Sequence, residues 1–303
     1  MFNKLIASIL PYFPQGLIWI FSRRYIAGKR IEDGIRVSHE LNQAGAEVTS
    51  DLLGEFITTL EEAEANKLAY LEVIDRFLAE GVKGNFSVKP TMFGLLLDQE
   101  VCYRQIREVV KEAAGKGSFI RIDMEDSQCV DMEIALYRRL KAEFPRSVGL
   151  VVQSYMRRTL SDLEAMMDMH TPESPLNFRL CKGIYIEPEA IAYKGYQEVR
   201  DNYLLLLDFM FRNKIYVGIA THDKFLIEGA YRLIEKYRVP ANLYEFQMLY
   251  GVTPELRASI IARNHLMRIY VPFGEKWFGY STRRLKENPK MASHIIKALF
   301  IRG

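Results

Sequence analysis

Short apolar segments that favour β-structure recur along the chain, and most are followed by a segment with the periodicity of an amphipathic helix. Such helical segments include residues 60–78, 101–114 and 204–211. The pattern predicts eight strands, at residues 46–50, 85–89, 119–123, 149–153, 177–182, 216–221, 244–247 and 268–272. Strands and helices that alternate at this spacing predict an α/β protein built on a parallel sheet.

The alternation alone does not distinguish a closed barrel from an open doubly wound sheet. Eight strand–helix units favour the barrel, and such barrels reach about 250 or more residues as one domain. No low-complexity linker divides the 303 residues. We therefore expect a distorted (β/α)8 TIM-type barrel at residues 44–303, preceded by an N-terminal helical arm at residues 1–43.

Residues 5–21 of this arm are mostly apolar and aromatic. Pro11 and Pro14 interrupt the segment, and neither part reaches the roughly 20 apolar residues needed to cross a bilayer. No small-residue cleavage pattern follows, so a signal peptide is not expected either. We favour a helical arm packed on the barrel, with a surface that touches membrane lipid as the alternative.

Composition and charge narrow the class of protein. Hydrophobic residues make up 49% of the chain and charged residues 26%, which is typical of a globular protein with a large core. The net charge is only +3 and the basic residues are scattered, so we expect no nucleic-acid partner. The three cysteines, Cys102, Cys129 and Cys181, are far apart, and neither they nor the histidines show metal-ligand spacing. We expect a cytoplasmic protein without disulfides or a metal site.

Polar residues gather where the predicted strands end. In a β/α barrel these ends face a common mouth, where active sites are built. They carry Lys89, Asp123, Gln153, Arg179, Lys182, Thr221, His222, Asp223, Gln247 and Tyr270. No glycine-rich dinucleotide fingerprint and no P-loop follows any of the strands, so a bound nucleotide would be held in another way.

The phrases around these strand ends resemble those of proline dehydrogenases, in order, from about Asp51 to the C-terminus. They are SVKPT at 87–91, RIDME at 121–125, VQSY at 152–155, FRLCKGIYIEP at 178–188, ATHD at 220–223, EFQMLYG at 245–251, RIYVPFG at 268–274 and RRLKENP at 283–289. Two positions depart from the family pattern: Pro90 stands where an aliphatic residue is expected, and Cys181 where a valine is usual. Neither departure removes a functional side chain.

The resemblance implies a role for each of these positions. The implied catalytic pair is Asp123 and Arg179, near the reactive edge of a flavin. The implied substrate-binding residues are Lys89, Tyr270, Tyr280, Arg283, Arg284 and Glu287, the last of them on a C-terminal helix over the barrel mouth. The implied FAD-binding residues are Met124, Gln153, Lys182, Gly183, Ile184, Thr221 and His222.

Physical arguments support some of these roles and offer competitors for others. On a helix, Glu287 shares a face with Arg283 and Arg284, and such a surface can hold the carboxylate and ammonium of an amino acid. An ordinary solvated ion pair is the alternative there. A buried Arg179 needs an acidic partner such as Asp123 even in a purely structural role, and His222 alone would suit a histidine that caps a helix. The resemblance also implies that Lys89 lies close to the substrate carboxylate and pairs with Asp123.

The implied function is FAD-dependent oxidation of L-proline to 1-pyrroline-5-carboxylate by hydride transfer to flavin N5. The implied electron acceptor is a membrane quinone. We expect the protein to lie in the cytoplasm, with peripheral contact at the inner face of the membrane as a further expectation. A separate pyrroline-5-carboxylate dehydrogenase would take the product. Three alternatives stay open: a lyase that forms a Schiff base on Lys89 or Lys182, a non-catalytic scaffold at the membrane, and a folate-reducing flavin barrel.

Overall fold

The computed structural model describes residues 15–54 and 57–287, without the side chains of residues 15, 17, 21 and 283–287. Eight parallel strands form a closed barrel in the order of the sequence. They are β1 (Glu47–Leu52), β2 (Gly84–Val88), β3 (Ile120–Ile122), β4 (Val148–Gln153), β5 (Asn177–Cys181), β6 (Tyr216–Ala220), β7 (Tyr244–Leu249) and β8 (Met267–Phe273). The predicted (β/α)8 fold and all eight strands are confirmed, and no strand end differs from the prediction by more than two residues.

The barrel closes because β1 pairs in parallel with β8 along its whole length, from Glu47 opposite Arg268 to Leu52 opposite Phe273. Every residue of β4 is buried, as expected for a parallel strand covered by helices on one face and by the barrel interior on the other. The pairing of β1 with β8, which the alternation of strands and helices does not predict, shows that the sheet is a closed barrel and not an open sheet.

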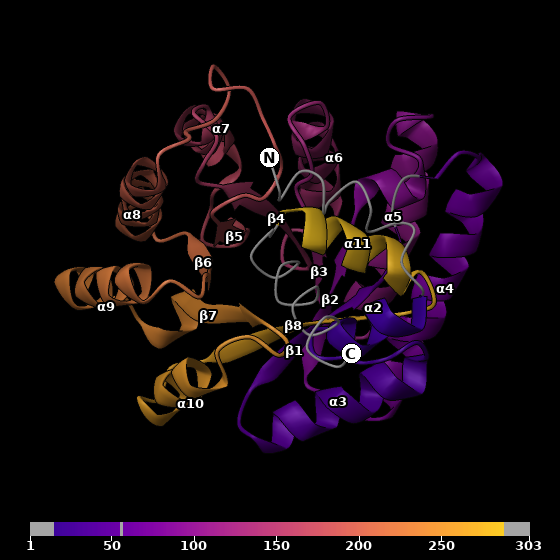
Figure 1. Ribbon diagram of the computed structural model, residues 1–303. Coiled ribbons are helices and arrows are strands. Elements are labelled where there is room, and N and C mark those ends of the chain that lie inside the picture. The colour runs from indigo at the N-terminus through magenta and orange to yellow at the C-terminus, as the bar shows by residue number, and fades with distance from the viewer. Residues whose placement is uncertain (1–14, 55–56, 288–303) are drawn as a thin grey trace.

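Helices surround the barrel (Figure 1). They are α3 (Ile31–Gln43), α4 (Leu60–Ala79), α5 (Gln99–Gly115), α6 (Val130–Glu143), α7 (Thr159–Met166), α8 (Tyr196–Arg212), α9 (Lys224–Tyr237) and α10 (Pro254–Ala262), with short 3-10 helices at Pro90–Phe93, Met167–Met169 and Ala241–Leu243. Polar side chains begin several of them. Asp98, for example, accepts hydrogen bonds from the backbone N–H groups of Glu100 and Val101 at the start of α5.

Two elements depart from a regular barrel. The last helix, α11 (Trp277–Glu287), follows β8 but lies across the mouth of the barrel, where the carboxyl ends of the strands meet (Figure 1). The place outside β8 and β1 is taken instead by α3, which packs against both strands through Ile35, Val37 and Leu41. The predicted helix over the mouth is therefore present, and α3 belongs to the wall of the barrel.

The part of the arm that the structure describes packs on the barrel. Helix α2 (Gln15–Ser22) contacts α11, and the rings of Trp19 and Trp277 meet edge to face with centroids 4.7 Å apart. Most of the apolar segment predicted at residues 5–21 lies outside the described residues, and the domain division at residue 43 stays a prediction. Within the described ranges, no helix is both long enough and apolar enough to cross a membrane.

Candidate active site

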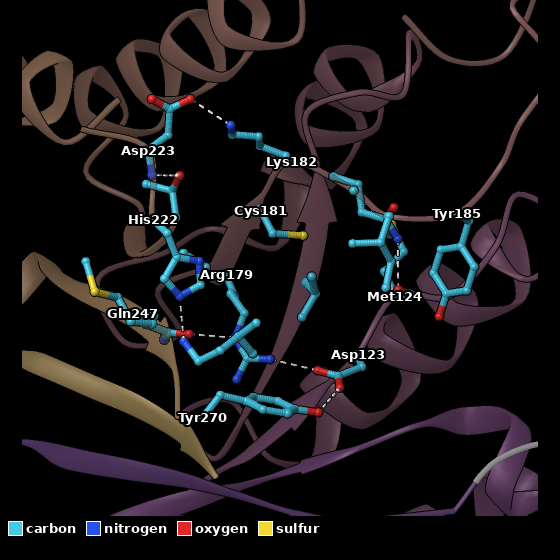
Figure 2. A pocket seen from close by; sticks show the side chains of 18 of the residues that line it. Asp123, Met124, Arg179, Cys181, Lys182, Tyr185, His222, Asp223, Gln247 and Tyr270 are labelled. Atoms are coloured by element: carbon cyan, nitrogen blue, oxygen red, sulfur yellow. Dashed lines mark hydrogen bonds and ion pairs between the residues drawn. The ribbon is translucent and has the colours of Figure 1, made fainter. Parts of the chain in front are cut away.

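A cavity of about 570 Å³ lies at the barrel mouth (Figure 2). Its volume is within the range of small-molecule and cofactor sites. Every predicted site residue whose side chain is described lines it: Lys89, Asp123, Met124, Gln153, Arg179, Lys182, Gly183, Ile184, Thr221, His222, Tyr270 and Tyr280. The ends of β2 to β6 and of β8, together with α11, bring these residues to one place.

Asp123 and Arg179 form an ion pair at the floor of the cavity. Arg179 Nη1 donates to Asp123 Oδ1 at 2.8 Å, and Ser87 Oγ donates to the same oxygen at 2.6 Å. The Tyr270 hydroxyl donates to Asp123 Oδ2 at 2.9 Å (Figure 2). Burial raises the pKa of Asp123, but Arg179 and Lys89 outweigh it, so that the pKa lies below its ordinary value. The carboxylate is therefore ionised at neutral pH.

Lys89 pairs mainly with a residue that the sequence analysis did not single out. Its Nζ lies 2.7 and 2.8 Å from the two carboxylate oxygens of Asp51, and 3.7 Å from Asp123 Oδ2. The expected contact with Asp123 is present but secondary. The physical reason is that β1 extends to Leu52, beyond its predicted end, and places Asp51 beside the end of β2. Burial raises the pKa of Asp51, and Lys89 opposes this rise.

Gln153 spans the wall between β3 and β4. Its Nε2 donates to the backbone carbonyls of Met124 and Glu125 at 2.8 and 2.9 Å. Gln153 Oε1 is buried and has no hydrogen-bond partner among the described residues, and the same holds for Arg179 Nη2. Buried polar atoms normally have a hydrogen-bond partner. The wall of this cavity carries one acceptor and one donor without such a partner in the described part of the structure, and a polar ligand in the cavity would supply both.

The opposite side of the cavity carries a group of charges around Asp223. Lys182 Nζ donates to Asp223 Oδ2 at 2.7 Å, and Arg200 donates to both carboxylate oxygens at 2.9 and 2.7 Å. Hydrogen bonding from Arg200 and Lys182 lowers the pKa of Asp223. Asp223 also caps α9, whereas His222 Nε2 accepts a hydrogen bond from the backbone N–H of Leu249. The helix cap considered for His222 is therefore formed by its neighbour.

Gly183 is the second residue of the loop after β5 and has a backbone conformation that favours glycine, with φ of 99°. A Cβ at this position would lie 2.1 Å from Cδ1 of Tyr155. Ile184 follows it at the rim of the cavity and is 47% exposed. The glycine thus lets the backbone of this loop lie against the Tyr155 ring.

Residues from α11 complete the site. Tyr280 is buried and lines the cavity with Tyr270. Arg283, Arg284 and Glu287 lie on the same helix, as expected, but their side chains are outside the described part of the structure. In the ranges with described side chains, no group of three or more histidine, cysteine or acidic residues could hold a metal ion.

Comparison with known proteins agrees with this geometry. The sequence model of the proline dehydrogenase family matches residues 35–297. Proline dehydrogenase 1 of Bacillus subtilis subsp. natto is 32% identical over 280 residues, which cover 92% of this chain and 90% of that protein. Proline dehydrogenase of Deinococcus radiodurans is 31% identical over 286 residues, covering 93% and 91%. The chain belongs to the proline dehydrogenase family.

A solved structure shares the fold. The proline utilization A protein of Bdellovibrio bacteriovorus, inactivated by N-propargylglycine, superposes with a TM-score of 0.82 at 24% identity, covering 89% of this chain and 32% of that one. This chain therefore corresponds to about a third of that larger protein. Membership in the proline dehydrogenase family makes the chain an oxidoreductase of proline catabolism, and the family is in general flavin-dependent.

The residues present fit a flavin. Arg179 Nη2 and Gln153 Oε1 offer a donor and an acceptor to a polar ring edge, and the remaining wall includes apolar side chains of Met124, Val151 and Met248. This combination of apolar lining and a few placed polar groups is typical of cofactor sites.

Two buried acids on the barrel strands, Asp51 and Glu245, were not predicted as site residues. Asp51 lay one residue past the predicted end of its strand. Glu245 lay inside a predicted strand, two positions before Gln247, so the period-2 alternation of strands would have placed both side chains on one face. A search for charged residues at inward positions of the predicted strands, rather than only at their ends, would have found Glu245.

Proposed function

We propose that the protein oxidises L-proline to 1-pyrroline-5-carboxylate with FAD as its bound hydride acceptor. The observation that carries this proposal is the placement of Arg179 Nη2 and Gln153 Oε1, both buried and unsatisfied among the described residues, in the cavity that Lys89 also lines. FAD, when bound, supplies flavin N5 as the atom that accepts the hydride. The residues proposed to hold it are Met124, Gln153, Lys182, Gly183, Ile184, Thr221 and His222.

The proposed proline site lies between Lys89 and α11. The Lys89 ammonium, with Arg283 and Arg284, would bind the carboxylate of proline, and Glu287 would lie near its nitrogen. Tyr270 and Tyr280 would pack against the saturated ring with their apolar faces. Tyr280 is buried and Tyr270 is only partly exposed, and this supports the role because the two rings limit the access of water to the reacting carbon.

The proline nitrogen must lose its proton before or during hydride departure, because its lone pair forms the new C=N bond. Asp123 is poorly suited to take this proton. Its oxygens already accept hydrogen bonds from Ser87, Arg179 and Tyr270, and its pKa lies below the ordinary value. We assign Asp123 instead to holding Arg179 and Tyr270 in place, and Arg179 to stabilising negative charge on the reduced flavin.

We further propose a membrane quinone as the electron acceptor and a separate pyrroline-5-carboxylate dehydrogenase as the next enzyme. Curated relatives named bifunctional protein PutA match over a quarter or less of their length, as in Escherichia coli, where 25% identity extends over 24% of the protein.

Peripheral membrane contact would be tested by liposome flotation. Deletion of residues 1–24 should weaken lipid association if the N-terminal segment makes that contact, and unchanged association would contradict it.

An anaerobic visible absorbance spectrum tests the proposed reaction. The purified protein should show flavin bands that bleach on addition of L-proline but not of D-proline. An Arg179→Lys variant that still binds FAD should bleach more slowly, because the guanidinium is replaced by a single donor group. Flavin bands indifferent to L-proline would reject the substrate, and failure to bind FAD after reconstitution would reject the cofactor.

The lysine-based lyase is the alternative that the geometry disfavours. A Schiff-base lysine must become a neutral amine. Lys89 and Lys182 each lie 2.7 Å from a carboxylate oxygen, of Asp51 and Asp223 respectively, so both nitrogens are already engaged in ion pairs and not directed at a substrate carbonyl. The same purified sample distinguishes a flavoprotein from a lyase. A lyase would be colourless, and borohydride would link it covalently to its carbonyl substrate.

A further inference from the structure

A series of hydrogen-bonded side chains runs from the barrel interior to the cavity, which Gln247 and Arg179 line. Arg268 Nε on β8 donates to both carboxylate oxygens of Glu245 on β7, at 2.8 and 2.9 Å. Glu245 Oε1 also accepts from Gln247 Nε2 at 2.5 Å. Gln247 Oε1 in turn accepts from Arg179 Nε at 2.6 Å. All four side chains are buried.

This series of hydrogen bonds determines which end of the Gln247 amide faces Arg179. An ionised carboxylate only accepts hydrogen bonds, so Glu245 must take the NH2 end of the amide. The carbonyl end is then left for Arg179 Nε. With the amide turned over, its NH2 group would face the Nε–H of Arg179, donor against donor. Burial raises the pKa of Glu245, but Arg268 outweighs it and keeps the carboxylate ionised.

A separate feature leaves room for the amide in this position. Gly218 on β6 lies beside it, and a Cβ at residue 218 would be 2.4 Å from Gln247 Nε2. The contact would be with the far end of a side chain, which can move, and not with the backbone. A methyl group at residue 218 would therefore push the amide away without breaking the barrel.

Both features act on the guanidinium of Arg179. With Nε held by Gln247 and Nη1 held by Asp123, the plane of the group is fixed and Nη2 is the nitrogen left without a partner among the described residues (Figure 2). We propose that Glu245 is a positioning residue that acts through Gln247 to aim Arg179 at the flavin, and that Gly218 leaves the space this requires. The inference rests on the proposed role of Arg179 beside FAD.

Two variants and one control test the proposal. In Glu245→Gln, one carbonyl oxygen must serve both Arg268 and Gln247, and an amide NH2 faces one of these donors. Gly218→Ala displaces the amide without changing any charge. Glu47→Gln is the matched control, because Glu47 accepts from Arg268 Nη2 at 2.6 Å but does not contact Gln247. All three keep the residues that line the cavity.

The readout is the midpoint potential of the bound flavin. The direction of its change distinguishes a displaced Arg179 from the loss of a negative charge. Loss of a negative charge at Glu245 would by itself favour the anionic reduced flavin and raise the potential. A displaced Arg179 stabilises that anion less and lowers it. We expect Glu245→Gln and Gly218→Ala to lower the potential by about 30 mV, a tenfold loss of preference for the reduced form, and Glu47→Gln to leave it unchanged.

Other outcomes overturn the proposal. A raised potential in Glu245→Gln would reveal a charge effect only, and an unchanged potential in Gly218→Ala would show that the amide does not position Arg179. Should Glu245→Gln fail to fold, Gly218→Ala still tests the Gln247 amide through which Glu245 is proposed to act. Crystal structures of the wild type and of Gly218→Ala, both without flavin, test the position of Arg179 independently of the proposed function. A guanidinium that moves supports the positioning role even if FAD does not bind, and one that stays contradicts it.

Discussion

At the scale of single residues, the barrel interior is unusual because charged side chains fill it. TIM-type barrels commonly pack branched apolar residues in this space, whereas here the charged side chains of Asp51, Lys89, Glu245 and Arg268 are all buried. A buried charge is tolerated only with a partner and with its hydrogen bonds satisfied. The contacts of each charge therefore determine both the stability of the barrel and the shape of the site.

Replacement of Asp51 by asparagine should destabilise the protein by about 3–5 kcal/mol, because it removes the nearest counter-charge of buried Lys89. Urea denaturation at neutral pH would measure the loss in free energy of unfolding. An Asp51→Leu, Lys89→Met double variant should recover most of it, since no buried charge is then left without its partner. A single variant as stable as the wild type would contradict the expectation.

Asp123 should make stability depend on pH at the acidic end. Its pKa in the folded protein lies below the ordinary value, so its contribution is fully present above the unfolded pKa of about 3.9 and is lost as pH falls through the folded value. The free energy of unfolding should therefore decrease more between pH 5 and pH 3 in the wild type than in Asp123→Asn. Equal decreases in the two proteins would show that Asp123 is not responsible.

At the scale of elements, the loop between β5 and α8 forms one side of the site and is held by specific contacts. The buried carboxylate of Glu187 accepts hydrogen bonds from the backbone N–H and the hydroxyl of Ser127, both at 2.7 Å. Gly183 lies near the start of the same loop, against the Tyr155 ring. The loop is thereby tied to the segment after β3, which carries Asp123 and Met124.

Substitution of Gly183 by alanine should displace this loop and weaken flavin retention, because the new Cβ overlaps the Tyr155 ring and φ is unfavourable. Gly81→Ala is a matched control, since Gly81 also has a positive φ, of 74°, but a Cβ there would meet no atom within 4 Å. We expect Gly183→Ala to lose about 1–3 kcal/mol of stability and much of its flavin, measured by thermal unfolding and by the flavin-to-protein absorbance ratio. Retention of flavin equal to that of Gly81→Ala would contradict a steric role.

At the scale of the whole molecule, segments from the two ends of the chain meet over the barrel mouth. The Trp19 ring on α2 packs against Trp277 on α11, and Lys29 Nζ lies 5.1 and 5.3 Å from the two ring centroids. Because α11 also carries Tyr280 and the proposed proline-binding residues, the arm that precedes the barrel supports the helix that closes its site.

Removal of the Trp19 ring in Trp19→Ala should raise KM for L-proline by roughly 2- to 10-fold with little change in kcat, because an aromatic pair contributes about 0.5–1.5 kcal/mol. Steady-state kinetics would measure this effect, and flavin content should stay the same. Ile20→Ala on the same helix is the control, since Ile20 is 54% exposed. Equal KM values for the two variants would show that α2 does not support substrate binding.

Local sequence patterns were sufficient to predict the eight strands and the residues at the mouth of the barrel. This was possible because strand periodicity is local and because the carboxyl ends of barrel strands converge whatever else the chain does. The family phrases added roles for those residues, and all those with described side chains line one cavity.

The hydrogen-bond partner of each buried polar group, by contrast, follows from the three-dimensional arrangement of the strands. Tyr270 bonds Asp123 across 147 positions of sequence, and Lys89 takes Asp51 ahead of Asp123. The placement of α3 between β8 and β1, which leaves α11 free to cross the mouth, likewise follows from packing. Such choices depend on distances across the barrel and on competition among several charges for the same hydrogen bonds, neither of which a local pattern contains.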